Sequence, residues 1–230
     1  MKRFLFGKSF LLAFAVLFTL SAFAEGDDDK ASEGKSTESS ATIDDIAFTG
    51  ASDYNGHAAV DLGLSVKWAT MNIGAKSPED YGDYYAWGET YTKKKYAKWT
   101  SVTTGFSMQN ISGDKRFDVA AAVWGGSWRI PTRTEMLELV NRCEWTWTTQ
   151  NEVKGYLVTG PNGNYIFLPA AGYCDYYGDG TSAGIVGEYW TSTPGAGYSD
   201  KSFNLEFKKS YIGCEASARS VGYSIRAVSQ

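Results

Sequence analysis

The chain carries few residues that could perform catalytic chemistry. Its single histidine is His57, so a three-histidine zinc site is excluded, and histidine-dependent nucleophilic catalysis would have to use this residue. The GxSxG pattern GTSAG at residues 180–184 lies in a Gly-rich connection before the expected strand EYWTST, and not between a strand and a helix as the nucleophile motif requires. We therefore expect His57 to be a surface or strand-edge residue, and we predict no catalytic residues.

Two carboxylate pairs, Asp80/Asp83 and Asp175/Asp179, have the residue type that glycoside hydrolysis uses. Both pairs lie next to glycines in turn-like sequence, where aspartates usually hydrogen-bond to the nearby backbone. Asp175 and Asp179, with Glu188, also offer oxygen atoms to calcium, although their spacing matches no EF-hand loop. We predict neither a metal site nor a cofactor, and leave open whether calcium binds residues 175–188.

Composition narrows the possible partners. The 230 residues are 43% hydrophobic, and 22 Lys+Arg against 26 Asp+Glu give a formal net charge of -4. The only run of basic residues is Lys93 to Lys95. A basic surface of the kind that binds nucleic acid is therefore not expected.

Residues 1–24 are typical of a signal peptide. Three basic residues precede an apolar run over residues 10–20, which ends in the small-x-small sequence Ala22-Phe23-Ala24. The run is too short to span a bilayer, and no cysteine follows it to carry a lipid. We expect cleavage near Ala24, no transmembrane segment in the mature chain, and a secreted, periplasmic or cell-surface protein.

Residues 25–53 form an acidic spacer in this interpretation. They contain nine acidic residues and two lysines, with few apolar residues to offset the loss of chain entropy. Disorder is therefore expected. The remaining residues, 54–230, carry 17 basic and 17 acidic residues and should form one neutral domain.

The pattern along this domain predicts an α+β fold. Apolar residues alternate over residues 59–68 and indicate extended chain, with a turn or bulge at Gly63. Helices are predicted over residues 118–123 and 132–142, the second with Thr132 as N-cap and Glu135 completing a capping box. Further strands are expected in GYLVTG, YIFLPAAGY, EYWTST, SFNLEF and YSIRAV. The aromatic residues before the helices are expected to pack into an ordered loop layer: Tyr81, Tyr84, Tyr85, Trp87, Tyr91, Tyr96 and Trp99.

Seven sequence motifs occur along the domain in a characteristic order. They are AVDLGLSVKWATMNIGA, PEDYGDYYAWGET, WGGSWRIPT, CEWTWT, NYIFLPAAGY, EYWTST and GYSIRAV. In order and spacing they resemble the Fibrobacter succinogenes major paralogous domain family, over about residues 57–228. The resemblance implies an exported bacterial domain with a C-type lectin-like fold, in which two short helices pack on antiparallel sheets with long ordered loops.

Two distant relatives of that fold imply opposite functions. The stretch DVAAAVWGGSWRIPTRTEMLEL is similar to formylglycine-generating enzymes, and the closing GYSIRAV is similar to variable proteins that bind ligands. The enzyme would need a cysteine pair that binds copper, and Cys143, Cys174 and Cys214 do not stand where that pair is expected. The calcium-dependent sugar motifs of true C-type lectins, EPN or QPD with a later WND, are also missing.

The cysteines are instead interpreted as structural. Cys174 and Cys214 bracket about 40 residues and are expected to form a disulfide in an oxidising compartment. Cys143 is expected to be a buried free thiol, since many sequences that this one resembles have cysteine where Met71 stands.

Binding is therefore the favoured function, by a monomer that recognises a glycan or a cell-surface protein. Exposed aromatic rings supply contact area at low entropic cost. The alternatives are a formylglycine-generating or other envelope enzyme, and a purely structural envelope protein. The expected ligand-binding residues lie in Gly- and Ser-rich connections: Tyr176, Tyr177, Tyr198, Asp200, Ser217 and Arg219.

Overall fold

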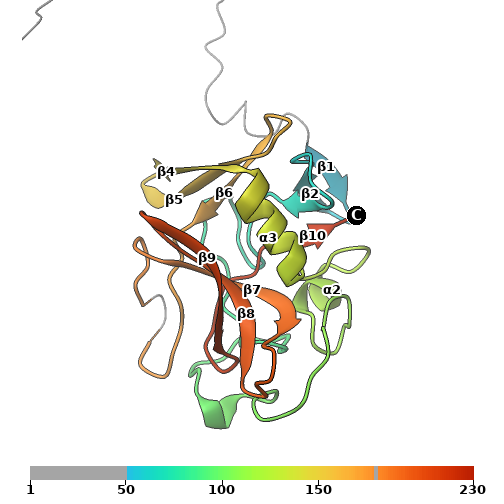
Figure 1. The fold of residues 1–230 in the computed structure, drawn as a ribbon, viewed down its shortest axis with the longest axis vertical. Helices are drawn as coiled ribbons and strands as arrows, with labels where there is room; N and C mark the ends of the chain where they lie inside the picture. Colours follow the sequence, from blue (N-terminus) through green and yellow to red (C-terminus); the bar gives the residue numbers. More distant parts are fainter. Residues whose placement is uncertain (1–50, 179–180) are drawn as a thin grey trace, which may run out of the picture. The chain divides into compact units, whose positions relative to one another are not determined.

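The computed structural model describes residues 51–178 and 181–230. The expected signal peptide and nearly all of the acidic spacer lie outside the described residues. Within the described residues, three antiparallel sheets are accompanied by two short α-helices and one 3-10 turn (Figure 1).

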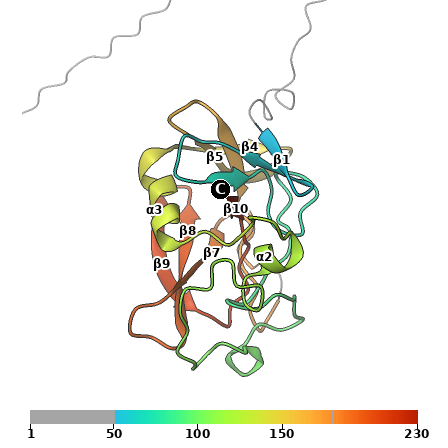
Figure 2. The same ribbon diagram turned by 90° about the vertical axis from the view of Figure 1, so that its right-hand side faces the viewer.

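The first sheet joins the two ends of the domain. Its strands are β1 (Ala51–Tyr54), β2 (His57–Val60), β3 (Lys67–Ala69) and β10 (Val228–Ser229), in the order β1-β2-β3-β10. Both ribbon views show the C-terminus beside this sheet (Figures 1 and 2).

The first strand begins earlier than the sequence suggested. The spacer was expected to extend to residue 53, but β1 pairs with β2 from Ala51 onward. Asn55 and Gly56 both have positive φ, 54° and 80°, as a two-residue hairpin turn requires. This local turn brings the last residues of the acidic segment onto the sheet.

Both predicted helices are present, and the second has its predicted cap. In α2 (Val119–Val123), the side chain of Asp118 accepts a hydrogen bond from the N–H of Ala121. In α3 (Arg133–Arg142), the capping box between Thr132 and Glu135 is confirmed. Arg129 adds an ion pair of 2.5 Å to Glu135 and so ties the preceding segment to the start of α3.

The second and third sheets are antiparallel meanders. β4 (Glu144–Gln150), β5 (Val153–Thr159) and β6 (Tyr165–Pro169) form one, and β7 (Gly187–Pro194), β8 (Lys201–Lys208) and β9 (Tyr211–Ala218) form the other. Helix α3 packs on all three strands of the third sheet, across which it runs in Figure 1.

Three elements differ from the expectation. The strand β4 was not among the expected strands. The sequence of β9, YIGCEASA, has too few apolar residues to indicate a strand, and its pairing with β8 over the whole length makes it one. Conversely, YSIRAV was expected to be a strand, but only β10 at its end is one. The rest of that segment makes isolated bridges, such as Tyr85 with Tyr223 and Tyr189 with Ser224.

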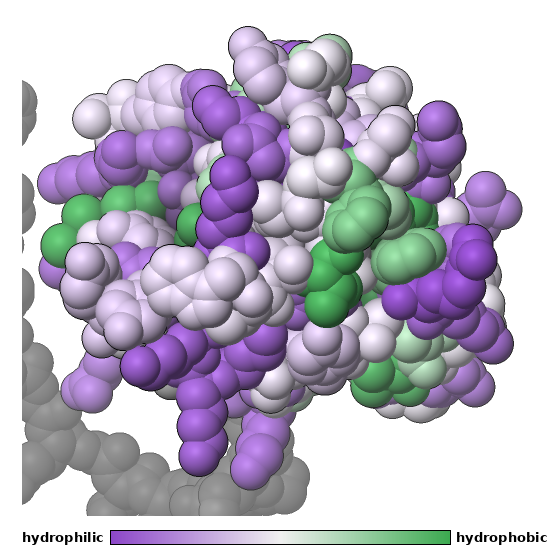
Figure 3. All heavy atoms as spheres, turned by 90° about the horizontal axis from the view of Figure 1, so that it is seen from below, coloured by the Kyte–Doolittle hydropathy of each residue, from purple (hydrophilic) through white to green (hydrophobic). Residues whose placement is uncertain are grey.

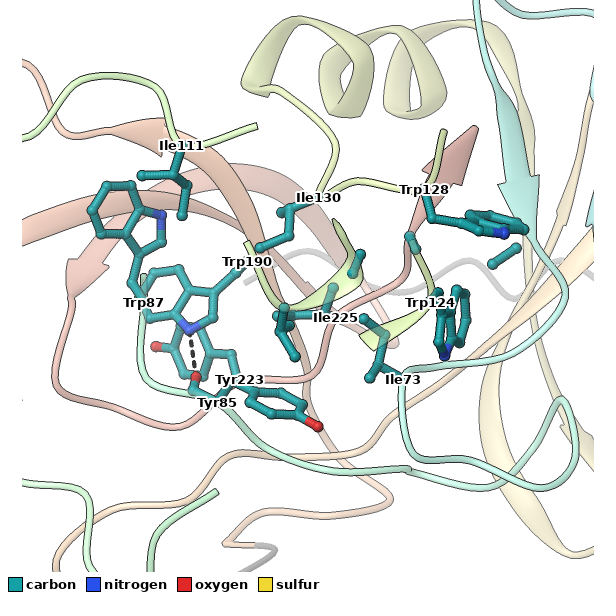
Figure 4. Packing of buried hydrophobic residues seen from close by; sticks show 14 of the residues in the cluster. Ile73, Tyr85, Trp87, Ile111, Trp124, Trp128, Ile130, Trp190, Tyr223 and Ile225 are labelled. Carbon is teal, nitrogen blue, oxygen red and sulfur yellow. Dashed lines mark hydrogen bonds between the residues drawn. The ribbon is translucent and has the colours of Figure 1, made fainter. Parts of the chain in front are cut away.

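The long connection between β3 and α2 is held by the C-terminal segment. Backbone N–H groups of Ile73, Tyr85 and Trp87 donate to carbonyls of residues 225, 223 and 219 at 2.9 to 3.0 Å. The core beneath it is rich in aromatic rings (Figure 4), and Trp190 Nε1 donates to the carbonyl of Tyr85 at 2.8 Å. This packing gives a connection with little regular structure a defined shape, and the connection carries Trp99 of the candidate site.

Candidate functional site

The six residues expected to bind a ligand separate into exposed and structural ones. Tyr176, Tyr177 and Tyr198 are exposed, whereas Arg219 is only 1% exposed. Ser217 is half-buried and hydrogen-bonds to the Tyr223 side chain. Asp200 is half-buried, and its carbonyl accepts the backbone N–H of Arg219 at 2.9 Å.

The exposed rings of Tyr176 and Tyr177 belong to a cluster with Trp99. The Trp99 and Tyr176 ring centroids are 5.4 Å apart at 63°, and those of Tyr176 and Tyr177 are 5.4 Å apart at 80°. Trp99 is 76% exposed and Tyr177 is 90% exposed. We call Trp99, Tyr176 and Tyr177 the aromatic cluster. Its rings are inclined to each other, so they present angled faces rather than one flat platform.

Trp99 is exposed, whereas the sequence predicted that it would pack into an ordered loop layer. Tyr85, Trp87 and Tyr96 are buried as expected, but Trp99 and Tyr91 are largely exposed. One sequence signal could have identified Trp99. It stands in KKKYAKWT, where four lysines accompany it and apolar partners are scarce.

The base of the aromatic cluster is rigidly held although its rings are exposed. Trp99 lies in the 3-10 turn η1 (Lys98–Thr100). Lys93 fixes the approach to this turn through a 2.7 Å ion pair with the buried carboxylate of Glu89 and a 2.8 Å hydrogen bond to the carbonyl of Thr100. On the other side, Asp175 Oδ1 accepts the N–H of Tyr177 at 2.7 Å and closes the turn that carries both tyrosines.

Positive charge surrounds this cluster. Lys94, Lys95 and Lys98 are exposed, and Lys95 Nζ lies 4.6 Å from the centroid of the Tyr176 ring. Across the described part of the chain, none of these three lysines forms an ion pair. Figure 3 shows the face seen from below, with small hydrophobic groups among polar residues rather than one broad apolar surface.

Tyr198 lies in a different place, at a pocket on the connection between β7 and β8. The pocket has a volume of about 300 Å³, and Arg219 contributes to its wall. The N–H of Gly105 donates to the carbonyl of Ser199 at 2.9 Å and links the two loops beside it. Tyr198 is 59% exposed, and Lys201 Nζ is 5.5 Å from its ring centroid.

The residues considered for catalysis or calcium binding have local roles. The His57 ring stacks on Trp124 with centroids 4.0 Å apart. Asp80 Oδ1 accepts the N–H of Gly82 within its own turn. Asp175 does the same for Tyr177, and Asp179 lies outside the described residues. No group of three His, Cys, Asp or Glu side chains within residues 51–178 and 181–230 is arranged to hold a metal ion.

Glu188 is the most perturbed acid of the described residues. It is buried on β7, and Asn204 Nδ2 donates to its Oε2 at 2.7 Å. Burial, together with the neighbouring carboxylate of Glu206, raises the pKa of Glu188 to about 8. A neutral carboxyl at this point of the sheet is therefore the stable form near neutral pH.

The expected disulfide between Cys174 and Cys214 is wrong, because no disulfide joins the three cysteines. Cys174 is buried in a small cluster with Ala86 and Tyr96. Cys214 lies on β9 opposite Leu205 and packs against a different cluster. The backbone pairing of each segment places the two sulfur atoms in separate parts of the core. Cys143, expected to be a buried free thiol, is half-buried and forms no disulfide.

Slow thiol modification is expected for Cys143 and Cys214. Burial raises the pKa of each thiol to about 11, so the reactive thiolate is about 100-fold scarcer near neutral pH than in an exposed cysteine. Mass spectrometry after iodoacetamide treatment at pH 7 should show slow labelling of both residues in the folded chain and rapid labelling in urea. Labelling of the folded chain at the rate of the unfolded chain would contradict this.

The fold and these surfaces define an α+β protein of antiparallel sheets that displays an aromatic cluster and a small pocket from ordered loops. Comparisons of the chain with protein-family models, curated proteins and solved structures gave no match. Among the described residues, no helix has the length and apolar character needed to cross a membrane.

Proposed function

We propose that the chain is an exported, monomeric, non-enzymatic binding or adhesion module that recognises a glycan through the aromatic cluster. The observation that carries this proposal is a row of three solvent-exposed rings on a hydrogen-bonded base, in which Tyr176 contacts both Trp99 and Tyr177. Exposed aromatic rings in contact with each other are costly to keep in water and are suited to stacking against sugar rings.

The resemblance to the Fibrobacter succinogenes major paralogous domain family, and through it to C-type lectin-like folds, supports the same proposal. An enzyme based on cysteine chemistry is less well supported, because the thiols of Cys143 and Cys214 have pKa values raised to about 11. The exposed lysines around the aromatic cluster favour ligands with acidic groups.

A glycan array, followed by affinity electrophoresis with the best polysaccharide, tests the proposal. Trp99→Ala and Tyr177→Ala should each weaken binding about tenfold, because each removes a stacking face worth on the order of 1 kcal/mol or more. Tyr211→Ala is the matched control, since this partly exposed tyrosine lies on β9 outside the aromatic cluster. It should bind like the unaltered chain.

Two results would overturn the proposal. Glycan binding that survives both Trp99→Ala and Tyr177→Ala would assign recognition to another surface. Absence of binding to every glycan, with binding to a surface protein instead, would replace the ligand class.

A further inference from the structure

The pocket beside Tyr198 is separate from the aromatic cluster and carries its own chemistry. Its volume of about 300 Å³ is at the lower end of the range for small-molecule sites. Hydroxyl-bearing and small residues form much of the wall, together with an aromatic ring and a guanidinium. The lining includes Ser107, Met108, Gly197, Tyr198, Ser199 and Arg219.

Arg219 reaches this pocket from within the core. Its Nε donates to the carbonyl of Lys201 at 3.1 Å and to Ser202 Oγ at 3.0 Å. Its Nη1 donates to the carbonyls of Thr103 and Phe106 at 3.1 and 2.8 Å. All four acceptors are neutral. The carboxylate of Asp200 acts on this guanidinium electrostatically, but no carboxylate of the described residues forms an ion pair with it.

A second buried arginine shows what is unusual about Arg219. Arg226 is also 1% exposed, and each of its three nitrogens has an acceptor: Asn72 Oδ1 and the carbonyls of Ala69 and Phe167. By contrast, Nη2 of Arg219 has no acceptor among the same described residues. It is also absent from the fully buried nitrogens without a partner, so this atom is not fully buried. Since Arg219 lines the pocket, Nη2 is the atom that can face it.

We propose that this pocket binds the carboxylate of an acidic sugar, which accepts hydrogen bonds from Nη2 of Arg219 while the sugar ring packs on Tyr198. A guanidinium whose own acceptors are all neutral attracts a carboxylate through charge-assisted hydrogen bonds. Lys201 near the Tyr198 ring adds a second positive charge. Ser107 and Ser199 offer hydroxyl groups to those of a sugar.

The choice of an acidic sugar rests on the proposed glycan binding, whereas the carboxylate site rests on Arg219 alone.

The test is a titration of the chain with sodium glucuronate, with glucose, and with an acidic peptide, at constant ionic strength. The Nε–H signal of Arg219 is followed by NMR and assigned through its correlations with the side-chain carbons of the same residue. Glucuronate should shift this signal with a Kd of about 1 mM, and glucose should not.

Variants that leave the buried Arg219 intact locate the site. Ser199→Trp fills the pocket from an exposed position and should weaken glucuronate binding at least tenfold. Ala196→Trp is the matched control, because Ala196 is exposed on the same connection but does not line the pocket. Trp99→Ala should retain glucuronate binding even where it abolishes binding of a polysaccharide.

The results of the glucuronate titration test the pocket separately from glycan binding by the aromatic cluster. Saturable glucuronate binding that Ser199→Trp removes and Trp99→Ala retains supports the pocket, whatever the glycan array shows. The inference is overturned if glucuronate leaves the Arg219 signal unchanged, if Ser199→Trp binds it normally, or if only the acidic peptide shifts the signal.

Discussion

Replacing Arg226 with methionine is expected to lower the free energy of unfolding by about 3 to 5 kcal/mol, the largest loss that we predict for one side chain. The guanidinium of Arg226 joins three segments, through Asn72 Oδ1 at 2.9 Å and the carbonyls of Ala69 at 3.0 Å and Phe167 at 2.9 Å. Methionine fills a similar volume but leaves these three buried acceptors without a donor, each at a cost of about 1 to 3 kcal/mol. Loss of the buried charge offsets part of this cost, since burial lowers the pKa of Arg226 to about 10.

Urea denaturation followed by circular dichroism measures this change. Arg116→Met is the control, because Arg116 is a largely exposed arginine whose partner, Asp114, is two residues away. The control should leave the midpoint unchanged. A shift for Arg226→Met as small as that of the control would mean that the three acceptors find other donors, and would contradict the prediction.

Replacing Glu188 with glutamine is expected to stabilise the protein at pH 7.5 by about 2 to 4 kcal/mol and to have little effect at pH 4. The pKa of Glu188 is raised from an ordinary 4.5 to about 8. Between these values the folded state binds a proton that the unfolded state has lost, so the free energy of unfolding falls as pH rises through this window. Each unit of the shift corresponds to about 1.4 kcal/mol. Glutamine is neutral at every pH, keeps an oxygen to accept from Asn204 and removes the cost.

Denaturation midpoints measured between pH 4 and 9 test the sign as well as the size of this effect. The groups around Glu188 that contribute are Glu206 and Lys208 on β8 and Glu215 on β9. Glu206→Gln removes the carboxylate that raises the pKa of Glu188 most, after burial. This variant should make the pH-dependent loss of stability smaller and end it at a lower pH, because it lowers the pKa of Glu188 in the folded state only. If Glu188→Gln is no more stable than the unaltered chain at pH 7.5, Glu188 is ionised in the folded state and the prediction is wrong.

The two buried arginines connect stability with recognition. Both side chains belong to the C-terminal segment, and both donate hydrogen bonds to backbone carbonyls of segments far away in the chain. Every side-chain nitrogen of Arg226 has an acceptor, two backbone carbonyls and the side-chain oxygen of Asn72, whereas Arg219 leaves one nitrogen for the pocket. Its stacking on Trp87, with Cζ 4.5 Å from the ring, fixes the guanidinium plane at the wall of the pocket. Substitution of Arg219 is therefore expected to disturb folding, which is why pocket-filling variants give the cleaner test.

Local features of the sequence were enough to predict several helices and strands of the fold. The capping box of Thr132 and Glu135 and the N-cap Asp118 act within three residues, and both helices start where these residues indicate. Alternating apolar residues likewise anticipated β2 and β3, and the turn formers between residues 160 and 165 anticipated the hairpin of β5 and β6. Short-range hydrogen bonds and periodic patterns involve residues close together in the sequence. They can therefore be recognised without knowing what the rest of the chain contacts.

The site itself depends on contacts between distant residues. Trp99 is exposed beside Tyr176 because η1 lies against the turn of residues 173–178, and the sequence placed it in a packed layer. Cys174 and Cys214 fall into separate clusters, and Arg219 meets the carbonyl of Thr103, 116 residues earlier. Residue types and turn signals indicated a neutral binding domain with aromatic loops. Three features are decided only when the C-terminal segment packs along the long connection: which rings reach solvent, where each thiol lies, and which arginine keeps a nitrogen without an acceptor. Burial is a property of the assembled chain and not of a residue's neighbours in sequence.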